Sequence, residues 1–122
     1  MFSFDEIIEQ SNGLFIRGIY DVIRCYKSHC GTSIELSKEV FIETLRYIIL
    51  NDIGVLEFRD WVENNEELKK SDLDVQLLYI YKSFPTEYDE SIPEKDIENL
   101  WWYVACPVDI GWKMEDGSYW FS

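Results

Sequence analysis

The chain has 122 residues, of which 24 are Asp or Glu and 11 are Lys or Arg, so its formal net charge is −13 at pH 7. This length predicts one domain with its own hydrophobic core. A hydrophobic content of 47% excludes a wholly disordered acidic tail. The acidity argues against direct binding of nucleic acid, whose phosphates are usually held by Lys and Arg. We therefore expect a folded protein whose partner is a basic protein surface.

The sequence offers no segment for export or for a membrane. Residues 1–6 carry no basic group and no small-residue cleavage site, so they do not resemble a secretory signal. The longest apolar run is far shorter than the roughly 20 residues that a spanning helix needs. We expect a cytosolic location.

The N-terminal part of the chain has a helical pattern. Ser3 and Glu6 have the spacing of a capping box, which predicts a helix start. Gly13 leaves two alternatives, one long helix or two shorter ones, and Gly31 is expected to end the segment. Apolar residues recur at a period of about 3.6, at Ile7, Ile8, Leu14, Phe15, Ile19, Val22, Ile23 and Tyr26.

A second helix is expected to begin at Ser37, with Leu36 and Phe41 as a hydrophobic staple across this N-cap. Residues 51–54 form a plausible helix stop. The predicted buried stripe of this helix consists of Val40, Phe41, Thr44, Leu45, Ile48 and Ile49.

Two further helices are predicted before the composition changes. Residues 55–63 are expected to form a short helix that ends at Asn64. Ser71 and Asp74 predict the start of the next helix, and Pro85 predicts its end.

After Pro85 we expect an acidic loop with one helical turn after Pro93. Residues 101–106 are aromatic and predict a strand, and residues 110–114 alternate as a strand does. Asp116 and Gly117 predict a tight turn into residues 119–121. The expected fold is α+β, mostly α: one domain over residues 1–122, with a helical part at about 3–84, an acidic loop at 85–99 and an antiparallel β-meander at about 100–122.

No pattern of catalytic or metal-binding residues stands out. Cys25, His29 and Cys30 are the one cluster of metal-ligand types, but only Cys106 remains as a fourth ligand and the paired Cys-x2-Cys spacing is missing. We expect reduced thiols and no metal. Hydrolase motifs and phosphate-binding glycine loops are also missing, so we expect neither an enzyme nor a cofactor.

The segment 87–98 carries the strongest functional signal, with six acids and one base, followed by an aromatic run. One interpretation is a protein-binding face in which carboxylates pair with Lys and Arg and a Trp serves as anchor. If residues 101 and 102 lie in a strand, their side chains point to opposite faces, so one Trp is exposed. The alternative is that one Trp belongs to the core and the acids only keep the domain in solution. The candidate partner-binding residues are Glu87, Tyr88, Asp89, Glu90, Glu94, Asp96, Glu98, Trp101 and Trp102.

Roughly the last 35 residues carry a resemblance, through residues 88–90 (Tyr-Asp-Glu), 101–103 (Trp-Trp-Tyr), 111–112 (Gly-Trp) and 116–117 (Asp-Gly). The chain resembles the small acidic immunity proteins of bacterial toxin–immunity systems, including contact-dependent growth inhibition. It is also similar to a family of uncharacterised bacterial proteins with a Trp-rich C-terminal tail. The first resemblance implies a cytosolic protein that binds a cognate toxin domain and blocks it without chemistry. Many such toxins are nucleases with basic clefts. The resemblance assigns no binding residue.

We therefore expect an immunity protein against a basic toxin domain, of the nuclease kind. The alternative is a structural or regulatory module that self-associates through exposed aromatic residues, although the charge of −13 on each copy opposes this.

Overall fold

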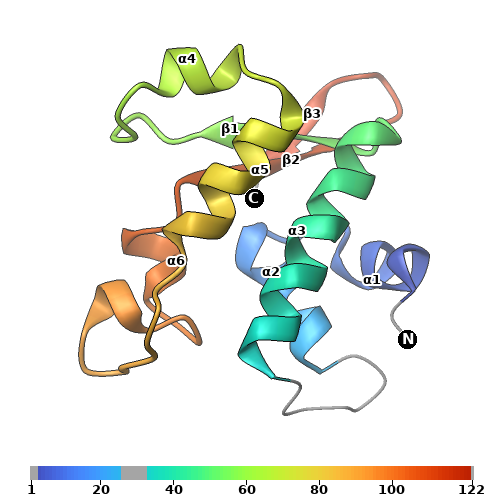
Figure 1. The fold of residues 1–122 in the computed structure, drawn as a ribbon. Helices are drawn as coiled ribbons and strands as arrows, with labels where there is room; N and C mark the ends of the chain where they lie inside the picture. Colours follow the sequence, from blue (N-terminus) through green and yellow to red (C-terminus); the bar gives the residue numbers. More distant parts are fainter. Residues whose placement is uncertain (1–2, 26–32, 122) are drawn as a thin grey trace. The chain divides into compact units, whose positions relative to one another are not determined.

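The chain has the α+β fold that the sequence predicts, with mostly helical structure and a small antiparallel sheet (Figure 1). The structure is a computed structural model that describes residues 3–25 and 33–121. It forms two compact units. The first unit combines residues 1–57 with residues 109–122, and the second, which we call the inserted unit, comprises residues 58–108.

The first unit begins with two helices, α1 (Phe4–Ser11) and α2 (Ile16–Arg24). The hydroxyl of Ser3 accepts a hydrogen bond from the Glu6 N–H at 3.4 Å, which confirms the predicted N-cap. Gly13 separates the helices with a φ of +87°, a conformation that favours glycine. The two-helix alternative is therefore correct. The predicted stop at Gly31 lies outside the described residues.

The third helix, α3 (Ile34–Leu50), begins earlier than predicted. The hydroxyl of Ser33 accepts a hydrogen bond from the Leu36 N–H at 3.2 Å, whereas Ser37 is buried within the helix. The predicted N-cap at Ser37 is wrong because Ser33 offers the same capping group one turn earlier. Asp52 has a φ of 55° just beyond the helix, so the predicted stop is confirmed. Of the predicted stripe, Phe41, Thr44, Leu45 and Ile48 are buried, and Val40 and Ile49 are half-buried.

The sheet has three strands in the order β1 (Gly54–Phe58), β2 (Val108–Lys113) and β3 (Tyr119–Phe121). The predicted helix over residues 55–63 is wrong, because residues 54–58 pair with β2 instead. Gly54 permits this pairing: a Cβ at this position would lie 2.6 Å from the carbonyl oxygen of Gly111. The predicted hairpin is confirmed, with Trp112 opposite Trp120 and Gly117 at a φ of +87° in the turn.

The core of the first unit joins its helices to β2. The indole N–H of Trp112 donates a hydrogen bond to the Leu14 carbonyl oxygen at 2.7 Å, so β2 is fixed to the loop between α1 and α2. Fully buried apolar side chains fill this core: Ile7, Ile16, Ile19, Tyr20, Ile23, Phe41, Leu45 and Ile48.

The inserted unit contains α4 (Asn65–Lys69), α5 (Leu73–Ser83), the 3-10 turn η2 (Pro93–Lys95) and α6 (Trp101–Val104). The predicted helix before Pro85 and the helical turn at Pro93 are confirmed. Capping by Ser71 is wrong, because its hydroxyl donates to the Glu67 carbonyl oxygen at 2.8 Å instead. No helix in the described ranges 3–25 and 33–121 is long and apolar enough to cross a membrane.

The predicted strand over residues 101–106 is also wrong, because residues 101–104 form α6. Phe84 stacks on Trp101 with ring centroids 4.6 Å apart and meets the edge of Trp102 at 5.9 Å. The Arg59 guanidinium donates to the carbonyl oxygens of Trp102 and Cys106 at 3.0 and 2.9 Å. These contacts stabilise the helical turn against the β-preference of its aromatic residues.

Candidate functional site

The acidic segment, residues 87–98, is organised by its own hydrogen bonds. The carboxylate of Asp89 accepts the Ser91 N–H at 2.9 Å and the Ser91 hydroxyl at 2.6 Å. The Asp89 N–H donates to the Lys95 carbonyl oxygen at 3.1 Å, which closes the loop around η2. Asp89 therefore shapes the segment rather than simply extending from it.

Asp96 connects η2 to α6 from within the fold, since only 5% of it is exposed. Its carbonyl oxygen accepts hydrogen bonds from the N–H groups of Asn99 and Trp101 at 3.0 and 2.9 Å. Its carboxylate accepts the Leu100 N–H at 3.3 Å. The Asp96 carboxylate therefore stabilises the local main chain, which is its main role here.

Trp101 and Trp102 are both fully buried, each with 0% exposure, so the prediction of an exposed Trp anchor is wrong. In a helical turn the two side chains need not point to opposite faces, and their rings meet edge to face at 4.8 Å. The Trp102 indole N–H donates to the Ile97 carbonyl oxygen at 2.7 Å. The Trp102 indole thus links the buried pair of rings to the acidic segment.

The outward side of this region combines charge with large apolar side chains. Glu87, Glu90 and Glu94 are exposed, while Glu98 is half-buried. Tyr88 lies among them with 45% exposure. We call the acidic surface the set of Glu87, Tyr88, Glu90, Ile92, Glu94, Glu98, Leu100, Tyr103 and Val104, of which all but Glu98 are exposed.

Sequence reasoning missed the apolar members Ile92, Leu100, Tyr103 and Val104. Three of these, at positions 100, 103 and 104, have the i, i+3, i+4 spacing of one helix face. A helical interpretation of residues 100–104 would have found them. The partner-binding role of the residues on this surface stays a prediction.

Electrostatics favour a protonated phenol and a charged carboxylate here. Desolvation raises the pKa of Tyr88, and the negative charges of Asp96, Glu90 and Glu98 raise it further. Hydrogen bonds from Ser91 lower the pKa of Asp89, with a smaller contribution from the charge of Lys95. At neutral pH the Tyr88 hydroxyl is therefore a hydrogen-bond donor, and the carboxylates around it are acceptors.

The cysteine cluster offers no described metal site. Cys25 is an exposed thiol, and Cys106 is a buried one. His29 and Cys30 lie outside the described residues. Within residues 3–25 and 33–121, no group of three or more His, Cys, Asp or Glu side chains is arranged to hold a metal ion.

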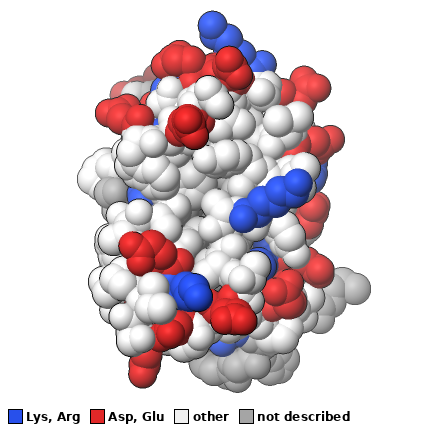
Figure 2. Space-filling model, turned by 60° about the vertical axis from the view of Figure 1, so that its left-hand side comes forward, with Lys and Arg blue, Asp and Glu red and all other residues white. Residues whose placement is uncertain are grey.

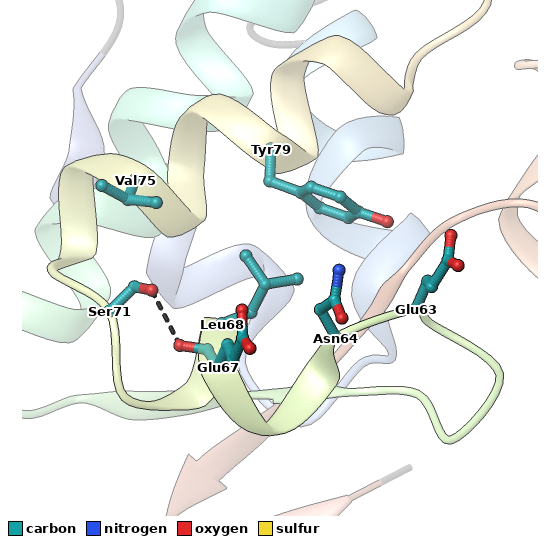
Figure 3. A pocket seen from close by; sticks show the side chains of 7 residues that line it. All are labelled: Glu63, Asn64, Glu67, Leu68, Ser71, Val75 and Tyr79. Atoms are coloured by element: carbon teal, nitrogen blue, oxygen red, sulfur yellow. Dashed lines mark hydrogen bonds between the residues drawn. The ribbon is translucent and has the colours of Figure 1, made fainter.

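A second feature of the inserted unit is a groove of about 270 Å³ between α4 and α5 (Figure 3). Tyr79 of α5 projects over it, facing Leu68 and Asn64 from the α4 side. Its lining consists of Glu63, Asn64, Glu67, Leu68, Ser71, Val75 and Tyr79. Aromatic, apolar and acidic side chains thus share one hollow.

Figure 2 shows a face on which acidic side chains gather at the upper and lower ends. Uncharged side chains fill much of the area between them. Along the sequence, the acids of the inserted unit lie in two stretches, residues 60–74 and 87–98.

The comparisons with known proteins show a family but no function. Residues 61–121 match DUF596, a family described as protein of unknown function. No curated protein and no solved structure matches the chain. The matched residues include the acidic surface, the groove and the hairpin of β2 and β3. Since the match spans half of the 122 residues, the chain belongs to the DUF596 family.

Proposed function

We propose that this protein is a cytosolic immunity protein, which binds a cognate basic toxin domain of the nuclease kind and blocks the surface that holds its substrate. The observation that carries the proposal is the acidic surface. There, Glu87, Glu90 and Glu94 are exposed on a hydrogen-bonded loop that also carries exposed Tyr88, and Tyr103 is exposed on α6, which follows this loop.

The inhibition needs no chemistry. A nuclease holds substrate phosphates with Lys and Arg. The exposed carboxylates pair with these groups and occupy the positions of the phosphates. Tyr88 and Tyr103, which are 45% and 54% exposed, supply rigid contact area beside the charges.

The loop is organised before it meets a partner. The hydrogen bonds of Asp89 and Asp96 fix its main chain, and Trp102 fixes Ile97. Little conformational entropy is then lost on binding, which favours affinity. The net charge of −13 adds long-range attraction to a basic partner and speeds encounter.

Co-expression with the C-terminal domain encoded immediately upstream in the source genome, as the candidate toxin domain, tests the proposal. We expect a one-to-one complex, loss of the domain's nuclease activity in that complex, and rescue of cells that produce the domain. Replacing Glu87, Glu90 and Glu94 together with Lys should weaken the complex and the protection.

The matched control replaces three exposed glutamates of the first unit, Glu9, Glu39 and Glu115, with Lys, which changes the net charge equally. This control should retain most of the binding. If both variants lost binding equally, the total charge and not the acidic surface would account for the effect. Failure of the wild-type chain to form a complex would contradict the proposal.

One observation favours self-association as a second candidate function. β3 is an edge strand of the sheet, and its residues Tyr119, Trp120 and Phe121 are all exposed. An edge strand with exposed aromatic side chains pairs readily with another strand. Sedimentation at low and high salt separates the candidates, because a dimer at micromolar concentration favours self-association and a monomer favours a different partner.

A further inference from the structure

The groove between α4 and α5 has an aromatic wall and an apolar floor. Figure 3 shows the ring of Tyr79 above Asn64, with Leu68 lower and to one side, the Tyr79 hydroxyl directed toward Glu63, and Val75 at the opposite end of the groove. Tyr79 is itself held by Phe58, whose ring centroid is 6.1 Å away at an interplanar angle of 68°. One ring face is therefore presented to the hollow in a fixed orientation.

Two exposed carboxylates, those of Glu63 and Glu67, line the rim of the groove. Across residues 3–25 and 33–121, neither carboxylate makes an ion pair or a hydrogen bond. Glu66, the neighbour of Glu67 on α4, instead lies 3.9 Å from the Lys69 ammonium group. The rim of the groove thus carries negative charge with no cation from the described chain against it.

The walls of the groove are fixed by hydrogen bonds to the main chain. The Gln76 amide donates to the carbonyl oxygens of Leu68, Ser71 and Lys69 at 2.8, 3.1 and 3.4 Å. The Ser71 hydroxyl donates to the Glu67 carbonyl oxygen, the bond drawn in Figure 3. These bonds hold the end of α4 against α5, so the groove exists before any ligand enters.

The size of the groove limits its occupant. A volume of about 270 Å³ lies below the roughly 300–1,000 Å³ of sites for cofactors and drug-sized molecules. One long side chain with an apolar stem and a cationic head matches both the volume and the lining. The stem would contact Leu68, and the head would meet Glu63 at the end of the groove toward which the Tyr79 hydroxyl points, while Glu67 adds negative charge from α4.

We infer that this groove is a subsite for one arginine side chain of a basic partner protein. Arginine fits better than lysine because its planar guanidinium stacks on the face of Tyr79 and at the same time donates paired hydrogen bonds to a carboxylate. Lysine offers only a point charge. That the partner is a toxin domain rests on the proposed function, but recognition of arginine does not.

A neighbouring hollow restricts what lies beside the arginine. Tyr79 also lines a hollow of about 390 Å³ with Lys82 and Ser83. The positive charge of Lys82 disfavours a second cation there. The partner segment therefore presents one arginine to the groove and an uncharged or acidic residue to the hollow beyond Tyr79.

The test uses the full chain and a short probe, the capped peptide acetyl-Gly-Arg-Gly-amide, in an NMR titration. We expect the ring signals of Tyr79 and the methyl signals of Leu68 to shift in a saturable way. The same peptide with neutral citrulline in place of arginine should leave these signals unchanged. The lysine peptide should bind more weakly than the arginine peptide.

Variants make the test specific. Glu63→Gln with Glu67→Gln should weaken peptide binding roughly fivefold, as expected for two exposed charge pairs. Tyr79→Leu should also weaken it, through loss of the ring. The control, Glu9→Gln with Glu39→Gln, removes the same charge from exposed positions of the first unit and should leave peptide binding unchanged.

Equal shifts with the citrulline peptide, or equal weakening in the control, would overturn the inference. Failure of the proposed function has a different signature, in which the toxin domain does not bind although the arginine peptide still does. If instead the toxin domain binds and the groove variants bind it as tightly as the wild type, the immunity proposal stands and the arginine subsite is not part of that interface.

Discussion

The indole of Trp102 connects the candidate surface to the interior of the inserted unit. Its ring is fully buried beside Phe84, and its N–H donates to the Ile97 carbonyl oxygen at 2.7 Å. A buried carbonyl that loses its donor retains the cost of its own desolvation. Trp102 is thus a structural residue of the surface rather than a contact residue.

Trp102→Phe should therefore lower the free energy of unfolding by about 1–3 kcal/mol, since it leaves the Ile97 carbonyl without this donor. Urea unfolding provides the measurement. Trp61→Phe is the matched control in the same unit, because Trp61 is exposed, and it should change stability by less than about 0.5 kcal/mol. Equal effects of the two substitutions would show that the buried hydrogen bond is unimportant.

Asp89 makes the acidic segment sensitive to pH. Its folded-state pKa is lowered by hydrogen bonds from Ser91, so its contribution to stability is present above the ordinary carboxyl pKa and is lost as the pH falls through the folded-state pKa. Ser91→Ala removes the hydroxyl donor and should raise the pKa of Asp89 in a carbon-13 NMR titration.

Asp116 and Ser118 repeat this arrangement in the β-hairpin, with the Ser118 hydroxyl bonded to the carboxylate and the pKa of Asp116 lowered. Ser118→Ala is therefore the control, and it should raise the pKa of Asp116 but not that of Asp89. An unchanged pKa of Asp89 in Ser91→Ala would show that the hydroxyl bond has no influence on the segment.

At the scale of elements, the start of α3 gives a direct test. Ser33→Ala removes the N-cap and should cost about 1 kcal/mol in thermal or urea unfolding. Ser37→Ala should be neutral or stabilising, because within the described residues the buried Ser37 hydroxyl has no hydrogen-bond partner. If Ser37→Ala lowered stability more than Ser33→Ala, the N-cap would be Ser37 and not Ser33.

Local patterns predicted the elements whose signals are contained within a few residues. The cap at Ser3, the stop at Asp52, the turn at Gly117 and the helix before Pro85 all follow from the chemistry of neighbouring residues. Ser33 and Ser37 show the limit, since both satisfy the capping pattern and only the packed helix distinguishes them.

Elements that depend on distant residues were not predictable in this way. Strand β1 forms because residues 54–58 pair with β2, which follows far along the chain. Helix α6 forms because Phe84 and Arg59 contact it from other parts of the inserted unit. Neither contact leaves a signal in the local sequence, so intrinsic preferences gave the wrong state at both places.

The candidate site likewise has features that the sequence predicts and features that depend on the fold. Composition located the acidic segment, and the exposure of Glu87, Glu90 and Glu94 agrees with it. Composition did not reveal that Asp96 is buried. An aspartate that accepts a hydrogen bond from the main chain cannot be distinguished by residue type from one that is exposed to solvent. The groove was not predictable either, since Gln76 brings its two helices together only in the folded chain.

At the scale of the whole molecule, the family match does not coincide with one compact unit. Residues 61–121 contain nearly all of the inserted unit together with all of β2 and β3. The third strand of that sheet, β1, precedes the matched region. The matched region alone therefore lacks a strand with which β2 pairs.

The total charge leads to a prediction about association. If the partner is basic, the association rate constant should fall by about tenfold or more as salt is raised, while the dissociation rate constant changes less. Stopped-flow mixing with the toxin domain measures both. An association rate independent of salt would contradict electrostatic attraction as the source of rapid binding.

Hydrogen bonding between the ends of the inserted unit bears on the order of folding. The Arg59 N–H donates to the Pro107 carbonyl oxygen at 2.9 Å, immediately beyond the paired ends of β1 and β2. Closing so long a loop in an unfolded chain has a large entropic cost, and contacts of this sequence separation slow folding. A folded inserted unit already holds its two ends together, which removes most of that cost. We therefore expect β1 and β2 to pair late, after residues 58–108 have folded.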